Sequence, residues 1–160
     1  LASRGVDDSR HDDLLAAFLP DYAARAAELS APYPGVGAAL ARLTENGHRL
    51  AICTNKPVEA AIAMLGTLGL SDHFRTIIGG GSLPQTKPDP APLHAAIDAC
   101  GGGPALFVGD SEVDLHCGVN AGVPVALFTK GYLRDPIAAT LAVCQFGEFA
   151  DLPDLVASFA

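Results

Sequence analysis

Residues 105–128 read ALFVGDSEVDLHCGVNAGVPVALF, and their pattern predicts the fold class. It opens with an apolar run at 105–109, continues with a helix-like segment at 111–118 that begins with a Ser-x-x-acid capping pattern, and closes with an apolar run at 123–128. A continuous apolar run of strand length is typical of a strand buried on both faces. Two such strands joined by a helix predict a parallel strand–helix–strand unit.

The same alternation extends from this unit in both directions along the chain. Apolar stripes at helical spacing and short apolar runs predict helices at 36–43, 57–68, 90–100 and 152–159 and strands at 50–53 and 75–78. No two-residue hairpin signal separates the strands. The sequence therefore predicts an α/β fold with a doubly wound parallel sheet.

Composition excludes several classes of protein. The chain has 160 residues, which fits one domain, and its 49% of hydrophobic residues excludes an intrinsically disordered chain. A formal charge of -8 is opposite to what nucleic acid attracts, so no nucleic-acid partner is expected. The apolar runs are far shorter than the roughly 20 residues of a membrane helix, so no membrane span is expected. Four scattered cysteines without a Cys-x-x-Cys pair predict a reduced, cytoplasmic protein whose thiols are buried or half-buried.

Polar side chains follow the predicted strands at the points where functional residues are expected. In a doubly wound sheet, ligands bind beyond the carboxyl ends of the strands. Thr54 and Asn55 follow the first strand, Lys87 follows the second across a glycine-rich loop, and Asp110 ends the third, with Asp114 four residues on. A hydroxyl, a lysine and a carboxylate able to hold Mg²⁺ are what phosphoryl transfer requires.

Each of these residues also has a purely structural explanation. Thr54 and Asn55 could cap the next helix. Lys87 could be a surface lysine, and Asp114 could be the acidic partner of a capping box. Asp110 is harder to explain in this way, because a carboxylate at the end of a buried strand needs a cation or hydrogen-bond donors.

Taken together, three segments resemble a known family. Residues 51–57 read AICTNKP, residues 87–90 read KPDP and residues 108–114 read VGDSEVD. In order and spacing they resemble the second, third and fourth motifs of the haloacid dehalogenase superfamily of phosphatases. Further short matches, GGGSLP at 79–84 among them, resemble the phosphoglycolate phosphatase group.

The resemblance implies a role for each matching residue. The Thr54 hydroxyl and the backbone N–H of Asn55 would bind the transferring phosphoryl group, and Lys87 would neutralise it and the nucleophile. Asp110 would ligate Mg²⁺, while Asp114 would hold a water ligand of the metal or orient Lys87. The implied activity is the hydrolysis of small phosphate monoesters, above all 2-phosphoglycolate, through an aspartyl-phosphate intermediate. The implied partner is a small phosphorylated metabolite.

The resemblance also implies a division of the chain. Residues 1–31 would be the remnant of a helical cap, and residues 32–160 would be a Rossmann-like haloacid dehalogenase core that lacks its first strand. In the family that strand is central, between the strands that end at Thr54 and Asp110. Its loss would leave two inner edges unpaired.

The family's nucleophile is the first aspartate of an Asp-x-Asp motif at the end of that first strand. Asp7-Asp8 and Asp12-Asp13 are adjacent pairs with no apolar strand before them, so they do not match it. We therefore expect that an N-terminal segment has been lost and that the 160-residue chain alone is an inactive fragment of a phosphatase.

Three other classes of protein share some of these features. A non-catalytic, phosphate-binding pseudo-phosphatase would keep the same residues and stays open. A receiver domain places its acidic residues first and its hydroxyl and lysine later, which is the wrong order. Dinucleotide binding fails because Gly79-x-Gly81 leads to Pro84 where the third glycine belongs, and no helix opens directly.

Overall fold

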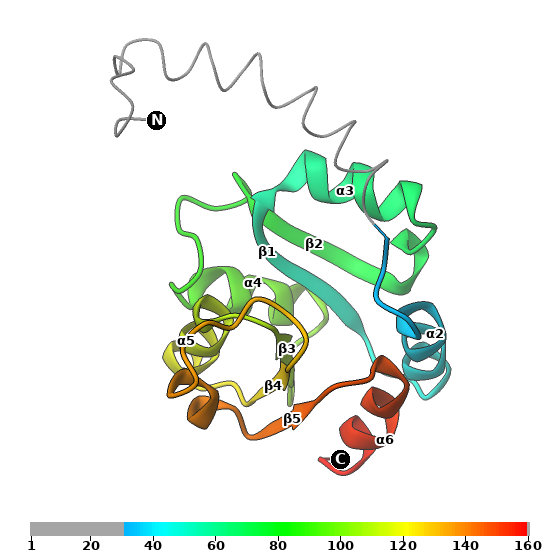
Figure 1. Ribbon diagram of the computed structural model, residues 1–160. Helices are drawn as coiled ribbons and strands as arrows, with labels where there is room; N and C mark the ends of the chain where they lie inside the picture. Colours follow the sequence, from blue (N-terminus) through cyan, green and yellow to red (C-terminus); the bar gives the residue numbers. More distant parts are fainter. Residues whose placement is uncertain (1–30, 160) are drawn as a thin grey trace.

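The structure, a computed structural model, describes residues 31–159, so the predicted cap remnant lies outside the described residues except for Ala31. Helices and strands alternate along the described chain (Figure 1). Their bounds are α2 (Val36–Glu45), β1 (Leu50–Pro57), α3 (Val58–Thr67), β2 (Phe74–Gly80), α4 (Ala91–Ala99), β3 (Phe107–Gly109), α5 (Glu112–Ala121), β4 (Val125–Phe128), β5 (Cys144–Phe146) and α6 (Leu152–Ala157), with 3₁₀ turns η3 (Ser71–His73), η4 (Ala138–Leu141) and η5 (Phe149–Asp151). Within residues 31–159, no helix is long and apolar enough to cross a membrane.

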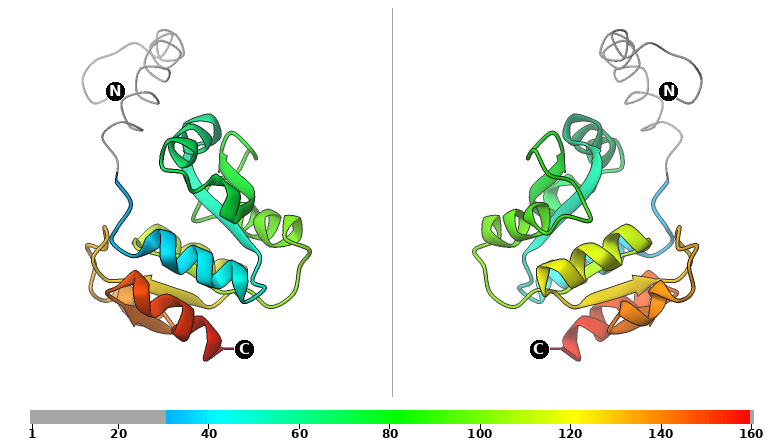
Figure 2. Two further views of the ribbon diagram at one scale, coloured as in Figure 1. Left: turned by 90° about the vertical axis from the view of Figure 1, so that its right-hand side faces the viewer. Right: turned by 90° about the vertical axis from the view of Figure 1, so that its left-hand side faces the viewer.

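All five strands between residues 31 and 159 pair in parallel, and they form two groups. In the first group β1 pairs with β2, with Ile52 beside Ile77. In the second, β4 lies between β3 and β5, with Ala126 beside both Val108 and Cys144. Figure 2 shows the two groups set apart, with helices around both. Parallel strands connected through helices confirm the predicted doubly wound α/β class.

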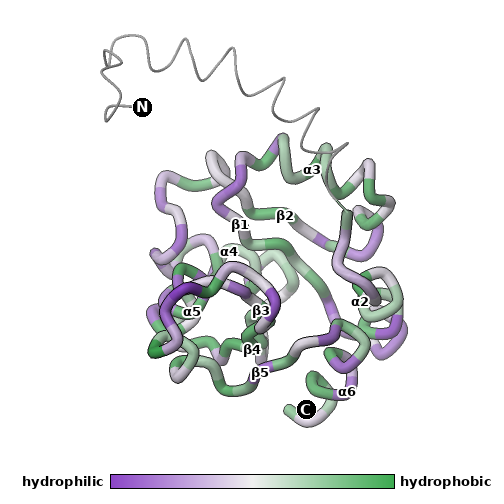
Figure 3. The backbone as a smooth tube through the Cα atoms, viewed as in Figure 1, coloured by the Kyte–Doolittle hydropathy of each residue, from purple (hydrophilic) through white to green (hydrophobic). Residues whose placement is uncertain are grey.

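Helices cover the strands on two sides (Figure 1): α4 and α5 lie on one side, and α2 and α6 on the other. The residues of β4 show the effect, because all four are buried. Val125 and Leu127 pack with Leu115 of α5, whereas Ala126 and Phe128 pack toward α2 and α6. In a strand covered on both faces every side chain is buried, so polar and apolar residues do not alternate. This explains the uninterrupted apolar sequence of β4. Figure 3 shows the same concentration of apolar residues along the strands.

An apolar cleft separates the inner edges of β1 and β3. In the described part of the chain, these two strands are not hydrogen-bonded neighbours. Ile52 and Cys53 of β1 and Phe107 and Val108 of β3 line the cleft, whose volume is about 590 Å³. The cleft thus lies between the two strands whose inner edges we expected to be unpaired.

The end of β2 differs from the prediction. Gly79 and Gly80 were expected in a loop, but both belong to β2. A Cβ atom on Gly79 would lie 2.7 Å from the Val58 Cα, and a Cβ atom on Gly80 would lie 2.8 Å from the Asn55 carbonyl oxygen. These glycines therefore allow the end of β2 to lie directly against the end of β1.

The cysteines have the burial that the sequence predicts. All four are free thiols; Cys117 is buried, and Cys53, Cys100 and Cys144 are half-buried. Small side chains of this kind fill gaps between helices and strands.

Gly118 marks the tightest approach of α5 to β4. A Cβ atom there would lie 2.1 Å from the Val125 Cγ2 and 3.0 Å from the Val123 carbonyl oxygen. We expect Gly118→Ala to lower the free energy of unfolding by about 1–3 kcal/mol through overpacking, although alanine is the better helix former. Gly37→Ala in α2 is the matched control, since a Cβ there meets nothing within 4 Å. It should stabilise by about 0.5–1 kcal/mol. Urea unfolding of both variants checks this, and equal stabilities would contradict the close packing.

Candidate active site

The carboxyl ends of the parallel strands bring the predicted site residues to one edge. Thr54 and Asn55 lie near the end of β1, and Asp110 directly follows β3. Lys87 stands in the turn between β2 and α4, and Asp114 lies in the first turn of α5. Hydrogen bonds join Asn55, Lys87, Asp110 and Asp114 into one cluster.

The Lys87 ammonium is the centre of this cluster. Its Nζ donates to the Asp114 Oδ1 at 2.7 Å and to the Cys53 carbonyl oxygen at 2.9 Å. It also lies 5.5 Å from the centroid of the Phe107 ring, within cation–π range. The Lys87 and Asp114 side chains are 10% and 8% exposed. Lys87 is therefore a largely buried cation with a carboxylate partner, and the alternative explanation of a surface lysine is wrong.

The Asn55 side chain fixes the backbone of Lys87. Its Nδ2 donates to the Lys87 carbonyl oxygen, and its Oδ1 accepts from the Lys87 N–H, both at 2.9 Å. On the other side of the turn, the Asn120 Nδ2 donates to the Pro88 carbonyl oxygen at 2.9 Å. The Lys87–Pro88 peptide bond is cis. Helix α3 has no side-chain cap, so the capping explanation for Asn55 is wrong.

The Asp114 carboxylate is held on three sides. Besides Lys87, its Oδ2 accepts from the Ser111 hydroxyl at 2.7 Å and from the Asp110 N–H at 3.1 Å. The capping-box explanation is also wrong, because the Ser111 hydroxyl donates to Asp114 and makes no bond to a helix N–H. Burial alone would raise the pKa of Asp114, but the Lys87 charge and these hydrogen bonds outweigh it and lower the pKa. The lowered pKa favours the charged form of Asp114, which accepts a hydrogen bond from the Lys87 ammonium.

Asp110 has the opposite electrostatic setting. Burial, and then the neighbouring Asp114 charge, raise its pKa above the ordinary carboxyl value, despite the opposing effect of Lys87. A carboxylate whose charge is disfavoured gains from a cation beside it. Mg²⁺ usually binds through one or two carboxylates and fills its remaining positions with water and phosphate oxygens. The Asp110 carboxylate therefore fits as one magnesium ligand.

Two neighbouring groups at the end of β1 differ in what they can do. The Thr54 Oγ1 accepts from the Lys56 N–H at 3.2 Å, and its own proton is left to donate. Burial raises the pKa of the Cys53 thiol to about 11, although Lys87 opposes this rise. The thiol is therefore neutral near pH 7 and is not an activated nucleophile.

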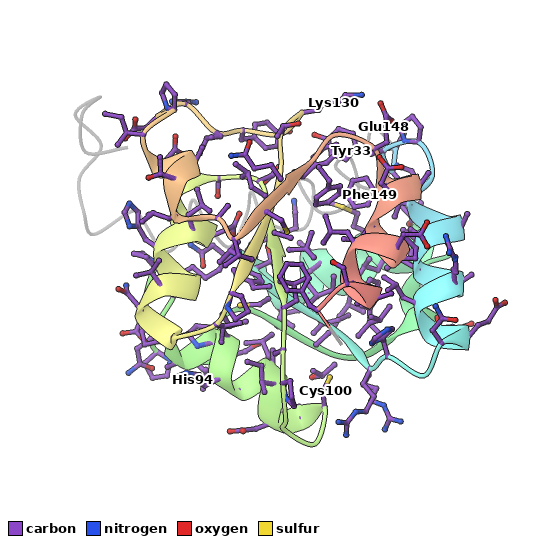
Figure 4. All side chains as sticks on the ribbon, turned by 90° about the horizontal axis from the view of Figure 1, so that it is seen from below. Tyr33, His94, Cys100, Lys130, Glu148 and Phe149 are labelled. Atoms are coloured by element: carbon purple, nitrogen blue, oxygen red, sulfur yellow. The ribbon has the colours of Figure 1, made fainter. Side chains whose placement is uncertain are left out.

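Further residues lie around the edge formed by the carboxyl ends of the strands. Figure 4 shows Tyr33, Lys130, Glu148 and Phe149 gathered at one end of the molecule, with His94 and Cys100 at the opposite end. Slight burial, and then the charges of Tyr132 and Asp110, raise the pKa of Tyr33. Sequence reasoning missed the supporting residues of the site. These are Phe107, Ser111, Glu112, Asn120 and Gly131.

The doubly wound fold and the residues at its strand ends define a haloacid dehalogenase-like hydrolase, and the chain belongs to that family, whose model matches residues 3–128. It is 44% identical over 158 residues to the phosphoglycolate phosphatase of Cereibacter sphaeroides, covering 98% of this chain and 72% of that protein. It is 44% identical over 151 residues to the phosphoglycolate phosphatase of Rhodospirillum rubrum, covering 93% and 63%.

The solved structures agree with the sequence relatives. A crystal structure from Haemophilus somnus, described as that of a predicted phosphoglycolate phosphatase, matches with a TM-score of 0.84 and 32% identity. The match covers 94% of this chain and 68% of that one. A haloacid dehalogenase-superfamily hydrolase from Geobacter sulfurreducens matches with a TM-score of 0.69 and 30% identity, covering 81% and 63%. The resemblance inferred from the sequence motifs is thereby confirmed.

The buried pair of Lys87 and Asp114 should carry much of the local stability. We expect Asp114→Asn to lower the free energy of unfolding at pH 7 by about 3–5 kcal/mol, because it leaves a buried ammonium without its counter-charge. Asp154→Asn is the matched control. Asp154 pairs with Arg42, and their side chains are 72% and 51% exposed, respectively. Loss of this exposed ion pair should lower the free energy of unfolding by less than about 1 kcal/mol.

The stability that Asp114→Asn loses should decrease as the pH falls. Because folding lowers the pKa of Asp114, its contribution is complete above the ordinary value of 3.8 and disappears as the pH falls through the lowered value. The stability gap between wild type and Asp114→Asn, followed by thermal unfolding between about pH 7 and pH 3, should therefore be constant down to about pH 4 and narrow below it. A gap that is constant across this range would refute the assignment.

Proposed function

We propose that this chain forms the core of a Mg²⁺-dependent phosphatase that hydrolyses small phosphate monoesters, with 2-phosphoglycolate preferred. The observation that carries the proposal is the buried Lys87 ammonium, fixed by Asp114 and the Cys53 carbonyl at the edge that also holds Thr54 and Asp110. A fixed cation at such an edge can stabilise charge that develops during phosphoryl transfer. The family membership and the names of the relatives support the same activity.

The proposed roles divide the site between binding and charge. The Thr54 hydroxyl and the backbone N–H of Asn55 bind the phosphoryl oxygens. Lys87 neutralises the phosphoryl group and the attacking carboxylate, and Asp114 keeps Lys87 charged and in place. Asp110 is one ligand of Mg²⁺, which when bound supplies positive charge next to the phosphate oxygens.

We further propose that the nucleophile is an aspartate on a strand outside these 160 residues, seated between β1 and β3. Its carboxylate oxygen forms a bond to phosphorus while the ester O–P bond breaks, and the leaving oxygen takes a proton. Water then hydrolyses the aspartyl phosphate and releases inorganic phosphate. The apolar cleft between the two strands supports this position. Without that strand the chain should show no turnover.

The proposed substrate and setting follow from the same features. The partner is a small phosphorylated metabolite, since the cluster offers one cation and one hydroxyl at the strand ends. Four free thiols among the described residues agree with a cytoplasmic location. The alternative is a phosphate-binding pseudo-phosphatase, which would use the same cation without chemistry.

A chimera tests the proposal. The part of the Cereibacter sphaeroides relative that the match leaves uncovered is fused to this chain, and phosphate release from 2-phosphoglycolate is measured with Mg²⁺ and with EDTA. We expect the 160-residue chain to be inactive. The chimera should release phosphate in the presence of Mg²⁺ but not in EDTA. Lys87→Met should lower kcat of the chimera by about 10²-fold or more. Arg42→Met, which removes an exposed cation of α2 paired with Asp154, is the matched control and should leave kcat unchanged.

Three results would each contradict one part of this proposal. Turnover by the 160-residue chain would refute the external nucleophile. A folded chimera that binds inorganic phosphate without turnover would favour the pseudo-phosphatase. Equal activities of Lys87→Met and Arg42→Met would remove Lys87 from the mechanism.

A further inference from the structure

We propose that Glu112 is a positioning residue that ties the loop of residues 129–135 across Asp110. Its Oε1 accepts from the backbone N–H of Arg134 at 2.5 Å and from that of Asp135 at 2.7 Å. Glu112 is the first residue of α5, and it stands two residues after Asp110. One carboxylate oxygen thus joins the start of this helix to a loop more than twenty residues further along the chain.

The other end of the loop is packed on Asp110 itself. The Tyr132 N–H donates to the Asp110 carbonyl oxygen at 3.0 Å. A Cβ atom on Gly131 would lie 2.3 Å from the Asp110 Cβ and 2.4 Å from its Oδ2. The loop backbone therefore touches the proposed magnesium ligand directly, with no room for a side chain.

These two attachments act together on one short segment. Arg134 and Asp135 are held by Glu112, while Gly131 and Tyr132 lie against Asp110. Lifting the loop from Asp110 requires breaking the bonds to Glu112, and losing those bonds frees the loop to move away. Tyr132, a residue that is 74% exposed, belongs to the same segment. The tie therefore sets both the orientation of the Asp110 carboxylate and the place of Tyr132 at the rim of the site.

A simpler role for Glu112 makes a different prediction. An acidic residue in the first turn of a helix also stabilises the helix dipole through its charge. Glutamine keeps the Oε1 acceptor but loses the charge, whereas alanine loses both. A tie through Oε1 predicts that Glu112→Gln resembles wild type, and a dipole role predicts that it resembles Glu112→Ala.

Amide hydrogen exchange in the 160-residue chain tests the tie without any activity. In Glu112→Ala the amides of Arg134 and Asp135 should exchange about tenfold faster or more, because each loses a bond to a charged acceptor. In Glu112→Gln the change should stay within about threefold. Glu148→Ala is the matched control. Glu148 meets the same loop through the Lys130 side chain and not through backbone N–H groups, so exchange at Arg134 and Asp135 should not change.

The effect of Glu112 on catalysis rests on the proposed function and is measured in the active chimera. Glu112→Ala should raise the Mg²⁺ concentration for half-maximal activity by about tenfold, and Glu112→Gln should restore it to within about threefold. Wild-type exchange at Arg134 and Asp135 in Glu112→Ala would overturn the tie, as would identical behaviour of the alanine and glutamine variants. Should the chimera with native Glu112 be inactive, the proposed function fails, while the exchange rates still decide the tie.

Discussion

The contact between the Lys87 ammonium and the Asp114 carboxylate holds the two groups of strands in relation to each other at the site. Lys87 comes from the turn before α4, Asp114 from α5, and the Cys53 carbonyl that shares the ammonium from β1. A buried cation must keep its partners, because an unpaired charge in the interior is costly. The charge requirement of one lysine therefore fixes the distance between segments that do not pair as strands.

The same contact gives two neighbouring carboxylates different properties. Asp110 and Asp114 lie four residues apart, yet the pKa of one is raised and that of the other is lowered. Asp114 has the ammonium, a hydroxyl and an N–H to satisfy its charge, whereas Asp110 has burial and a negative neighbour. One carboxylate thus holds the lysine in place, and the other is the one that favours an incoming cation.

The sequence could predict the order of strands and helices and the cluster at the strand ends. Uninterrupted apolar runs indicate buried parallel strands, and the carboxyl ends of such strands meet at one edge. It could not predict β5, because three residues with an exposed Gln145 carry no measurable period. Nor could the sequence show whether Asn55 and Asp114 cap helices or bind Lys87, since each local pattern is compatible with both roles. Contacts with Lys87, 32 and 27 residues away along the chain, decide the matter.

The regular spacing of contacts along α5 has a consequence for how this helix can change. Asp114, Cys117 and Asn120 contact Lys87, Asp89 and Pro88 respectively, one residue in every three along a single face. Val113, His116 and Val119, each one residue earlier, are exposed. Substitutions on the face of Asp114, Cys117 and Asn120 would displace Lys87. Substitutions of the exposed residues beside that face would have little effect on Lys87. A fluorophore or a surface anchor attached at position 116 or 119 would leave the lysine turn in place.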